Sequence, residues 1–332
     1  MARIAIVGAG IAGLTLARGL AADHDVTVFE KSRGPGGRMA TRYAGQFEFD
    51  HGAQFLTASS PALQQFVAPL IRDGIVAPWP ARYAEISGSA ITARSRWGVD
   101  EPRYVGVPRM NAIGKALASG VDVRYEAEVR QLERAGGNWT LQIADSTGTE
   151  CAASAEWVLV CVPLAQAETV LAAVPEFSRA VGERKMLGCH ALMLGFEDHP
   201  ELSFDAASVS GADISWIALN SSKPGRGGAA AVVAHASNTW SEANMELDSA
   251  AVIGHMIGEV SRVTGIQADA AVHKAVHRWR YANSPGGGPA THWLDTRARL
   301  GVAGDWWIRG RVEFAFESAR ALELADLGLV TY

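Results

Sequence analysis

The chain has 332 residues, of which 48% are hydrophobic and 20% are charged, and its formal net charge is −5. This length and composition are typical of a soluble globular protein with more than one domain. The small net charge, without long runs of either sign, argues against a nucleic-acid partner and an anionic membrane surface. No apolar stretch reaches about 18 residues, so we expect no membrane span.

The first residues predict a strand, a glycine turn and a helix. Residues 3–7 are apolar, Gly8, Gly10 and Gly13 follow at once, and residues 14–22 are typical of a helix. The first glycine allows a tight turn, the second lets a pyrophosphate approach the backbone, and the third lets the helix pack on the strand. The pattern predicts a dinucleotide site. Chance glycines and a secretory signal are the alternatives, and the glycine spacing does not suit a signal peptide.

A second strand at residues 25–29 ends on Glu30, where a carboxylate can accept hydrogen bonds from a ribose hydroxyl. Its charge disfavours a 2′-phosphate, so FAD and NAD remain as candidates. The run Gly36-Gly37-Arg38 resembles the second signature of the amine-oxidase superfamily of flavoproteins, in which this turn lies under the FAD pyrophosphate. The resemblance therefore favours FAD.

Residues 47–55 alternate as a strand that breaks at Gly52, and they contain the run Asp50-His51-Gly52-Ala53-Gln54. In the flavoprotein superfamily this run passes close to the flavin ring; the alternative is a hairpin strand with a polar end. Residues 128–130 are predicted to continue a strand at residues 121–125. The superfamily pairs the backbone at Val129 with adenine, whereas sequence alone indicates a buried valine.

Further elements are predicted in chain order. Helices are expected at residues 61–71, 112–118 (after Asn111 as N-cap), 164–172, 249–264 and 314–327. Strands are expected at residues 139–144, 157–162, 186–196, 214–219, 229–236, 272–281 and 300–305.

Three other features bear on chemistry. The strand at residues 300–305 ends on Gly304-Asp305, where a carboxylate can bind flavin ribityl hydroxyls; an ordinary turn is the alternative. His273 and His277 are four apart, but their strand-like context argues against a metal site. Cysteines are few and lack a CxxC spacing, so we expect no disulfide framework, no zinc and a reducing cytoplasm. They are Cys151, Cys161 (a small core residue) and Cys189.

The predicted fold class is α/β, with a Rossmann-like FAD-binding domain and a second mixed-sheet α+β substrate domain of the amine-oxidase and p-hydroxybenzoate-hydroxylase type. The FAD-binding domain is assigned to residues 1–60, 104–165 and 296–332, and the substrate domain to residues 61–103 and 166–295.

Over nearly its whole length the chain resembles the bacterial renalases, a branch of the amine-oxidase superfamily. The motifs that carry the resemblance are Lys31-Ser32-Arg33-Gly34-Pro35-Gly36-Gly37-Arg38-Met39, Gly52-Ala53-Gln54-Phe55, Trp216 through Ser222-Lys223-Pro224, His235-Ala236 with Trp240-Ser241, His277-Arg278-Trp279 with Tyr281-Ala282, and Gly304-Asp305-Trp306 with Gly310-Arg311-Val312-Glu313. The chain departs from the family at Arg109 and Phe314, where glycine is usual.

The resemblance implies non-covalent FAD, and residues 300–327 contain no cysteine for a covalent link. It implies a cofactor site made of Gly8, Gly10, Ile11, Ala12, Gly13, Glu30, Lys31, Gly36, Gly37, Arg38, Met39, Ala53, Gln54, Phe55, Val129, Gly304, Asp305, Arg311 and Val312.

It also implies an activity: oxidation of isomeric (2- or 6-) dihydronicotinamide dinucleotides to NAD(P)+ by hydride transfer to FAD N5, after which O2 reoxidises the flavin and gives H2O2. Such a donor needs no protein nucleophile and no strong base, only a ring held against the flavin. The candidate lining is Trp216, Asn220, His235, Trp279 and Trp307, with Arg278, Arg280 and Arg309 for a substrate phosphate. As alternatives, these residues are core tryptophans, a satisfied strand histidine and surface arginines.

Two other functions stay open. A monoamine-oxidase type of enzyme would need an aromatic cage and a lysine near the flavin, for which Lys185, Lys223 and Lys274 are poor candidates on sequence alone. The second is a flavin-binding protein without oxidase activity.

Overall fold

The computed structural model describes residues 1–325 and 327, and the chain divides into two compact units. Unit 1 contains Met1–Arg38, Gly114–Met186 and the described residues from Asn283 onward, and unit 2 contains Met39–Ile113 and Leu187–Ala282. These boundaries differ from the predicted ones. Residues 39–60 and 104–113 belong to unit 2, whereas residues 166–186 and 283–295 belong to unit 1.

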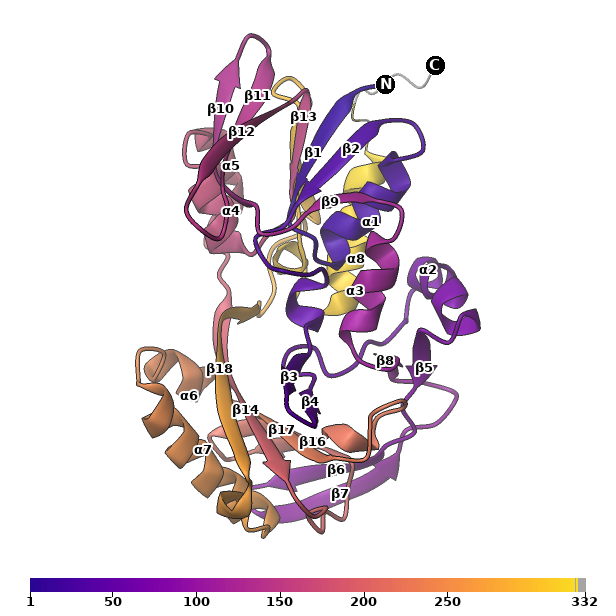
Figure 1. Cartoon of the computed structure of the whole chain (residues 1–332), viewed down its shortest axis with the longest axis vertical. Coiled ribbons are helices and arrows are strands. Elements are labelled where there is room, and N and C mark those ends of the chain that lie inside the picture. Colours follow the sequence, from indigo (N-terminus) through magenta and orange to yellow (C-terminus); the bar gives the residue numbers. More distant parts are fainter. Residues whose placement is uncertain (326, 328–332) are drawn as a thin grey trace. The chain divides into compact units, whose positions relative to one another are not determined.

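Unit 1 is built on a six-stranded sheet in the order β19-β20-β13-β1-β2-β9, of which β13, β1, β2 and β9 are labelled in Figure 1. All neighbours are parallel except β19, which runs antiparallel to β20. Strands β1, β13 and β20 are apolar almost throughout and largely buried, as is typical of parallel strands covered on both faces. The strands are β1 (Arg3–Val7), β2 (Asp25–Phe29), β9 (Asp122–Arg124), β13 (Trp157–Val160), β19 (His292–Asp295) and β20 (Leu300–Ala303).

Different elements cover the two faces of this sheet (Figure 1). The helices α1 (Ile11–Leu20) and α8 (Val312–Leu324) pack against each other on one face. An antiparallel three-stranded sheet and two helices share a core with the other face: β10 (Glu128–Ala135), β11 (Asn138–Ala144), β12 (Glu150–Ala155), α4 (Leu164–Val170) and α5 (Pro175–Val181). The short elements η1 (Gly37–Met39) and α3 (Asn111–Ala118) cross the unit boundaries, and η4 (Asp305–Trp307) follows β20.

Three predictions for unit 1 need correction. Helix α1 begins at Ile11, so Gly13 lies inside the helix and not before it. Residues 128–130 do not continue β9: the chain turns at Glu126, whose φ is +53°, and β10 pairs with β11 in another sheet. Helix α8 begins at Val312 and ends at Leu324, short of the predicted end at residue 327, and residue 326 lies outside the described residues.

Unit 2 is built on a seven-stranded sheet in the order β18-β14-β17-β16-β15-β6-β7. Its strands are β6 (Arg82–Ser87), β7 (Ala90–Arg96), β14 (Leu187–Phe196), β15 (Ala206–Ser210), β16 (Ile214–Leu219), β17 (Ala230–Ala236) and β18 (His273–Asn283). The remaining elements are β3 (Arg42–Ala44), β4 (Phe47–Phe49), α2 (Pro61–Arg72), β5 (Val76–Pro78), β8 (Tyr104–Gly106), η2 (Asn220–Ser222), α6 (Asn238–Ala243), α7 (Ser249–Thr264) and η3 (Ala268–Ala270).

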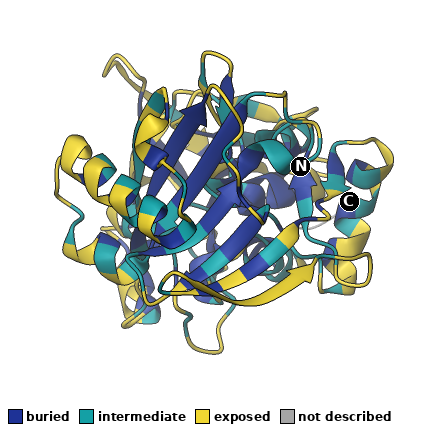
Figure 2. Ribbon diagram, turned by 90° about the horizontal axis from the view of Figure 1, so that it is seen from below, coloured by how far each residue is buried: buried dark blue, intermediate teal, exposed yellow. Residues whose placement is uncertain are grey.

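The two faces of the seven-stranded sheet are buried differently. Alternate residues of β17 point to opposite faces: Val232 and Ala234 pack in one core with α7, whereas Val233 packs with Phe47 and Phe49 of the β3–β4 hairpin. His235 therefore lies on the hairpin side of the sheet. The middle strands are largely buried, whereas β7 at the edge is exposed along its whole length (Figure 2).

The predicted strands at residues 186–196, 214–219, 229–236 and 272–281 and the helix at 249–264 are confirmed to within two residues. The predicted strand at residues 47–55 is wrong beyond Phe49, because polar side chains from Asp50 onward hydrogen-bond in a loop instead of a ladder. The predicted fold class, a Rossmann-like α/β unit with a second mixed-sheet unit, is confirmed.

Candidate cofactor and substrate sites

The glycine loop after β1 is closed by its own backbone. Gly8 has φ of +101°, and its N–H donates to the carbonyl oxygen of Phe29 at 2.8 Å. A Cβ on Gly13 would lie 2.0 Å from the Gly8 oxygen, so this position excludes any side chain. A Cβ on Gly10, in contrast, would meet no atom within 4 Å. The loop therefore leaves open space at the start of α1, whose first N–H groups have no side-chain cap and suit a phosphate.

Glu30 links the glycine loop to the chain after β2. Its carboxylate accepts hydrogen bonds from the Ala9 N–H at 2.7 Å and from the Ser32 N–H at 2.8 Å, and the residue is 7% exposed. Each carboxylate oxygen keeps a further lone pair for a ribose hydroxyl. The predicted role of Glu30 is compatible with this geometry.

The second and last predicted signatures meet in unit 1. Gly36 has φ of +111° and donates its N–H to the Ala9 oxygen at 2.8 Å. Arg38 forms a two-pronged ion pair with Asp305, with Nη1 at 2.8 Å from Oδ2 and Nη2 at 2.5 Å from Oδ1. Such bidentate pairs fix both partners. The pair joins segments that lie 267 residues apart in the sequence.

The other predicted cofactor residues of unit 1 lie at ends and irregularities of elements. Ile11 and Ala12 are buried in the first turn of α1, and Lys31 is exposed. The β10–β11 ladder shifts register just after Val129, so its backbone lies at an irregular position. Arg311 precedes α8 without capping it, and Val312 is the first helical residue. FAD fits these features of unit 1: the closed turn at Gly8, the open space at Gly10, the start of α1 without a side-chain cap, and the spare lone pairs of Glu30.

A buried charge cluster lies in unit 2, and its ionised members are Asp50, Lys223 and Arg226. Lys223 Nζ lies 3.3 Å from Asp50 Oδ2, Arg226 pairs with the same oxygen, and all three side chains are at most 2% exposed. Burial raises the pKa of Asp50, but the charges of Lys223 and Arg226 outweigh it and hold the pKa at about 2. Burial lowers the pKa of Lys223 to about 8, opposed by Asp50. The cluster holds two cations for one carboxylate.

The charge cluster continues into the loop after β4. Lys223 Nζ donates to Gln54 Oε1 at 3.2 Å, and Gln54 Nε2 donates to the carbonyl oxygens of Asp50 and Gly52. The His51 oxygen in this loop accepts from Trp279 Nε1 at 3.0 Å and contacts His235 Nε2 at 3.1 Å. These contacts bring the predicted cofactor residue Gln54 together with His235 and Trp279 of the predicted substrate lining, whose roles stay predictions.

Both histidines of this loop region titrate well below neutrality. Burial is the largest cause and lowers the pKa of His235 to about 4, with a further contribution from Lys223. The pKa of His51 is also lowered to about 4, by burial and by His277. Both side chains are neutral at pH 7.

An aromatic cluster in unit 2 consists of Phe55, Tyr83, Trp97 and Trp216. The rings of Trp97 and Trp216 are near parallel, with centroids 6.3 Å apart and planes inclined by 15°. Tyr83 stacks on Trp97 at 5.2 Å, and Phe55 contacts both tryptophans. All four residues are half-buried. Such rings offer flat apolar surface for a planar ligand.

The other predicted residues have structural partners. Asn220 is fully buried and donates to the Glu48 oxygen at 2.8 Å. Trp307 lies in the core of unit 1, stacked on Trp306 at 4.5 Å, so a role for it toward substrate stays a prediction.

The predicted phosphate partners differ in their surroundings. Arg278 and Arg280 both pair with Glu246, and Arg309 is exposed. Of the remaining predicted cofactor residues, Met39 is buried and Ala53 is half-buried in unit 2.

Sequence reasoning missed four residues. Lys223, judged a poor candidate, is completely buried with Arg226, and no pattern in residues 220–228 shows which cation faces the interior. Tyr83, on β6, and Trp97, just after β7, join Trp216 from segments far away in the sequence. The Asp50 motif could have indicated the two missed cations, because a carboxylate that is buried requires a positively charged partner.

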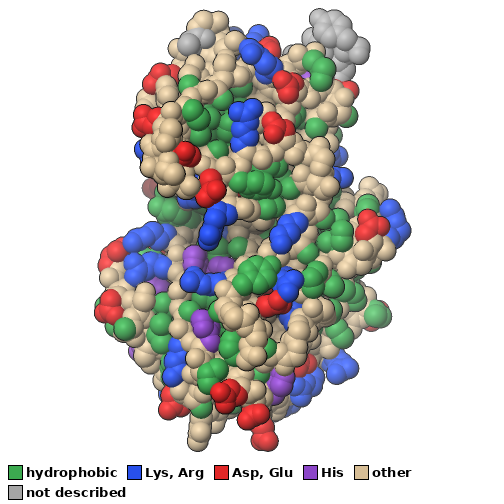
Figure 3. Space-filling view, viewed as in Figure 1, with side chains coloured by type: hydrophobic (Ala, Val, Ile, Leu, Met, Phe, Trp, Pro, Cys, Tyr) green, Lys and Arg blue, Asp and Glu red, His purple; other side chains and the backbone are tan. Residues whose placement is uncertain are grey.

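Within the described residues no group of three or more His, Cys, Asp and Glu side chains is arranged for a metal. No described helix is long and apolar enough to cross a membrane. Acidic and basic side chains are interspersed over the face seen in Figure 3.

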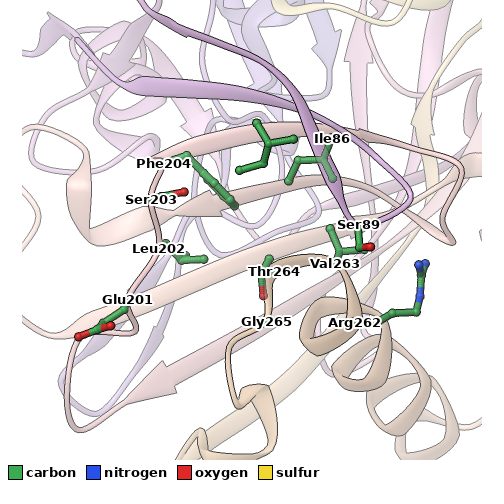
Figure 4. A pocket seen from close by; sticks show the side chains of 11 residues that line it. Ile86, Ser89, Glu201, Leu202, Ser203, Phe204, Arg262, Val263, Thr264 and Gly265 are labelled. Carbon is green, nitrogen blue, oxygen red and sulfur yellow. The ribbon is translucent and has the colours of Figure 1, made fainter.

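A hollow of about 310 Å³ in unit 2 lies among Ile86, Phe204, Val263 and neighbouring residues (Figure 4). None of the predicted site residues lines it. It belongs to the α7 side of the sheet, which His235 does not face.

Comparison with known proteins gives two family matches. Residues 6–70 match the NAD(P)-binding Rossmann-like domain, and residues 83–321 match the flavin containing amine oxidoreductase family. Among solved structures, a protein of Exiguobacterium sp. 255-15 provisionally assigned as a protoporphyrinogen oxidase has a TM-score of 0.75 at 11% identity, with 98% of each chain covered. Wild-type putrescine oxidase bound to putrescine has a TM-score of 0.69 at 14% identity, with 99% of each chain covered.

At these identities the structural likeness concerns the fold alone. The family model, in contrast, spans well over half of the chain and includes the aromatic cluster apart from Phe55, the lysine and arginine of the charge cluster, and Asp305. The chain therefore belongs to the flavin containing amine oxidoreductase family, and its cofactor is FAD.

Proposed function

We propose that the protein oxidises isomeric dihydronicotinamide dinucleotides, which carry the hydride at ring position 2 or 6, to NAD(P)+. The balanced reaction consumes one dihydronicotinamide, one O2 and one proton, and gives NAD(P)+ and H2O2. Non-covalently bound FAD supplies the hydride acceptor at N5 and the reaction with oxygen. The resemblance to the bacterial renalases supports this substrate class.

The observation that carries the proposal is the combination of flat half-buried rings with titratable groups that do not act as bases at neutral pH. Trp216 and its aromatic neighbours offer surface on which a pyridine ring can lie. The pKa of His235 is about 4, and Asp50 is ion-paired and fully buried. A dihydropyridine needs no base, because its ring nitrogen drives hydride release. Positioning is the main requirement, and the site is suited to that.

An amine substrate is the alternative that the aromatic cluster also favours, because aromatic faces attract ammonium groups. The solved structures of similar fold include putrescine oxidase bound to putrescine. Against an amine, the buried carboxylate of Asp50 is already neutralised by Lys223 and Arg226 and is not available to pair with a ligand.

One experiment separates these activities. The yellow FAD-loaded protein is mixed anaerobically with 2- and 6-dihydro-NAD isomers, with ordinary 1,4-dihydro-NAD, or with putrescine and aromatic amines, and flavin absorbance is followed. We expect rapid bleaching by the isomers and stoichiometric H2O2 when air is admitted. Bleaching by amines alone would establish the amine oxidase, and no bleaching by any donor would support a flavin-binding protein without oxidase activity.

A further inference from the structure

The hydrogen bonds around His235 determine which of its ring nitrogens carries the proton. Its Nε2 lies 3.1 Å from the carbonyl oxygen of His51. A carbonyl oxygen only accepts hydrogen bonds, so Nε2 must be the donor in this contact. With a pKa of about 4 the ring is neutral at pH 7 and carries one proton. That proton is on Nε2, and Nδ1 has a free lone pair.

Gln54 excludes the opposite arrangement. Its Nε2 lies 3.4 Å from His235 Nε2 and could in principle donate to an unprotonated ring nitrogen. Both amide hydrogens are, however, directed at the carbonyl oxygens of Asp50 and Gly52, and Oε1 accepts from Lys223 Nζ. The amide orientation is therefore fixed, and no hydrogen is left for His235.

The His51 oxygen is itself held in place. Its loop is fixed on one side by Asp50, which accepts from Thr41 Oγ1 at 2.7 Å and from the Met110 N–H at 3.1 Å besides its two cations. On the other side the oxygen accepts from Trp279 Nε1. A rigid acceptor of this kind fixes a histidine tautomer, as outer hydrogen bonds do for metal-bound histidines.

His235 stands next to Trp216 on the sheet. The two residues are register partners on the antiparallel strands β17 and β16, so their side chains are neighbours on one face. Trp216 Nε1 is buried and has no hydrogen-bond partner among the described residues. Within the described residues the pair thus combines a ring surface with one acceptor, His235 Nδ1, and one donor, Trp216 Nε1, that no other group bonds.

We infer that His235 Nδ1 accepts a hydrogen bond from the carboxamide N–H2 of the dihydronicotinamide ring, and that His235 determines specificity for the amide form of the substrate. A carboxamide presents N–H donors and a C=O acceptor in one plane, which complements the acceptor of His235 and the donor of Trp216. The inference rests on the proposed function. The His51 carbonyl and Gln54 act as positioning groups, because they set the tautomer without needing to touch substrate.

The test compares isomeric dihydro-NAD with the matching isomers of dihydro-nicotinate adenine dinucleotide, in which a carboxylate without N–H replaces the amide. We expect the bleaching rate divided by substrate concentration to be about 10- to 100-fold higher for the amide form. A carboxylate cannot donate a hydrogen bond to His235 Nδ1, and its negative charge is repelled by the lone pair of that nitrogen. His235→Leu should remove this preference. His235→Gln should keep it, because Gln can donate to the His51 oxygen and still offer an acceptor.

The exposed histidine His255, which bonds Asp213 at 2.9 Å, provides the control: His255→Gln should leave both rates unchanged. A spectroscopic readout is independent of activity. In the ¹⁵N-histidine NMR spectrum of the holoprotein, the resonance pair lost in His235→Gln should show a protonated Nε2 and an unprotonated Nδ1.

The outcomes are distinguishable. Equal bleaching by amide and carboxylate forms, or a protonated Nδ1, would overturn the inference and leave the proposed function standing. Bleaching by neither form would overturn the proposed function together with the inference.

Discussion

Asp50 holds two cations in the interior of unit 2, so its removal and the removal of one cation have unequal consequences. Asp50→Asn leaves Lys223 and Arg226 buried without a counter-charge, and we expect a loss of about 3–5 kcal/mol in the free energy of unfolding. Lys223→Met leaves the Asp50–Arg226 pair intact, and we expect a change of less than about 2 kcal/mol. Urea unfolding monitored by tryptophan fluorescence measures both. Equal losses would contradict this account of the charge cluster.

The two low-pKa histidines predict how stability depends on pH. His51 and His235 have pKa values of about 4 in the folded protein, against about 6.5 when unfolded. Between these values the unfolded chain binds protons that the folded protein does not, so the free energy of unfolding falls as pH drops from about 6.5 to about 4. We expect about 1–3 kcal/mol from each histidine. In His235→Gln part of this slope should disappear in urea titrations at pH 7, 6, 5 and 4.5; an unchanged slope would exclude His235 as a source.

The sequence predicted which types of residue lie in the candidate site better than it predicted the partners of their side chains. Gln54, His235 and Trp279 were all named from short motifs, and the structure brings them into contact around the His51 loop, although their roles toward FAD and substrate stay predictions. Lys223 was passed over because burial of a lysine depends on a carboxylate 173 residues away. Trp97 was missed because ring stacking between segments more than a hundred residues apart leaves no local pattern.

The start of helix α1 gives a matched pair of glycine variants. Gly13→Ala places a Cβ 2.0 Å from the Gly8 oxygen, so we expect a destabilisation of at least about 1–3 kcal/mol. Gly10→Ala meets no protein atom, and we expect a change below about 1 kcal/mol. Its methyl group occupies the space predicted for the pyrophosphate, so FAD affinity should fall even though the fold persists. Equilibrium unfolding and fluorimetric FAD titration measure the two effects; normal FAD binding by Gly10→Ala would contradict the placement.

Helices and strands with a clear hydrophobic periodicity were predictable from the sequence, whereas the turns that separate neighbouring strands were not. Strand β16 and helix α7 were predicted to the residue, because each is an uninterrupted pattern between polar turns. Strand β10 was joined to β9 because the predicted strand residues 121–125 and 128–130 are separated by only two residues. A residue with φ of +53°, Glu126, separates them, and sequence gives no sign that a glutamate adopts it.

We expect FAD to be bound to the protein without a covalent link. Cys161 directly follows β13 in the FAD-binding unit. Burial raises the pKa of its thiol to about 12, and a protonated thiol is a poor nucleophile for a covalent link to flavin. We expect acid precipitation of the yellow protein to release all flavin into the supernatant. Added FAD should also raise Tm, since free ligand at 100 times Kd adds about 2.7 kcal/mol. Flavin retained in the washed pellet would demonstrate a covalent link.

The interleaved course of the chain has a consequence for its synthesis on the ribosome. Once residue 282 has emerged, every residue of unit 2 is available, whereas unit 1 still lacks β19, β20 and α8. Helix α1 packs on α8, and β13 needs β20 at its side. The glycine loop, which is made well before these elements, therefore waits for residues beyond 292 before its sheet and helix layer are complete. We expect nascent chains stalled before that point to carry a finished unit 2 and an FAD site still unable to retain the cofactor.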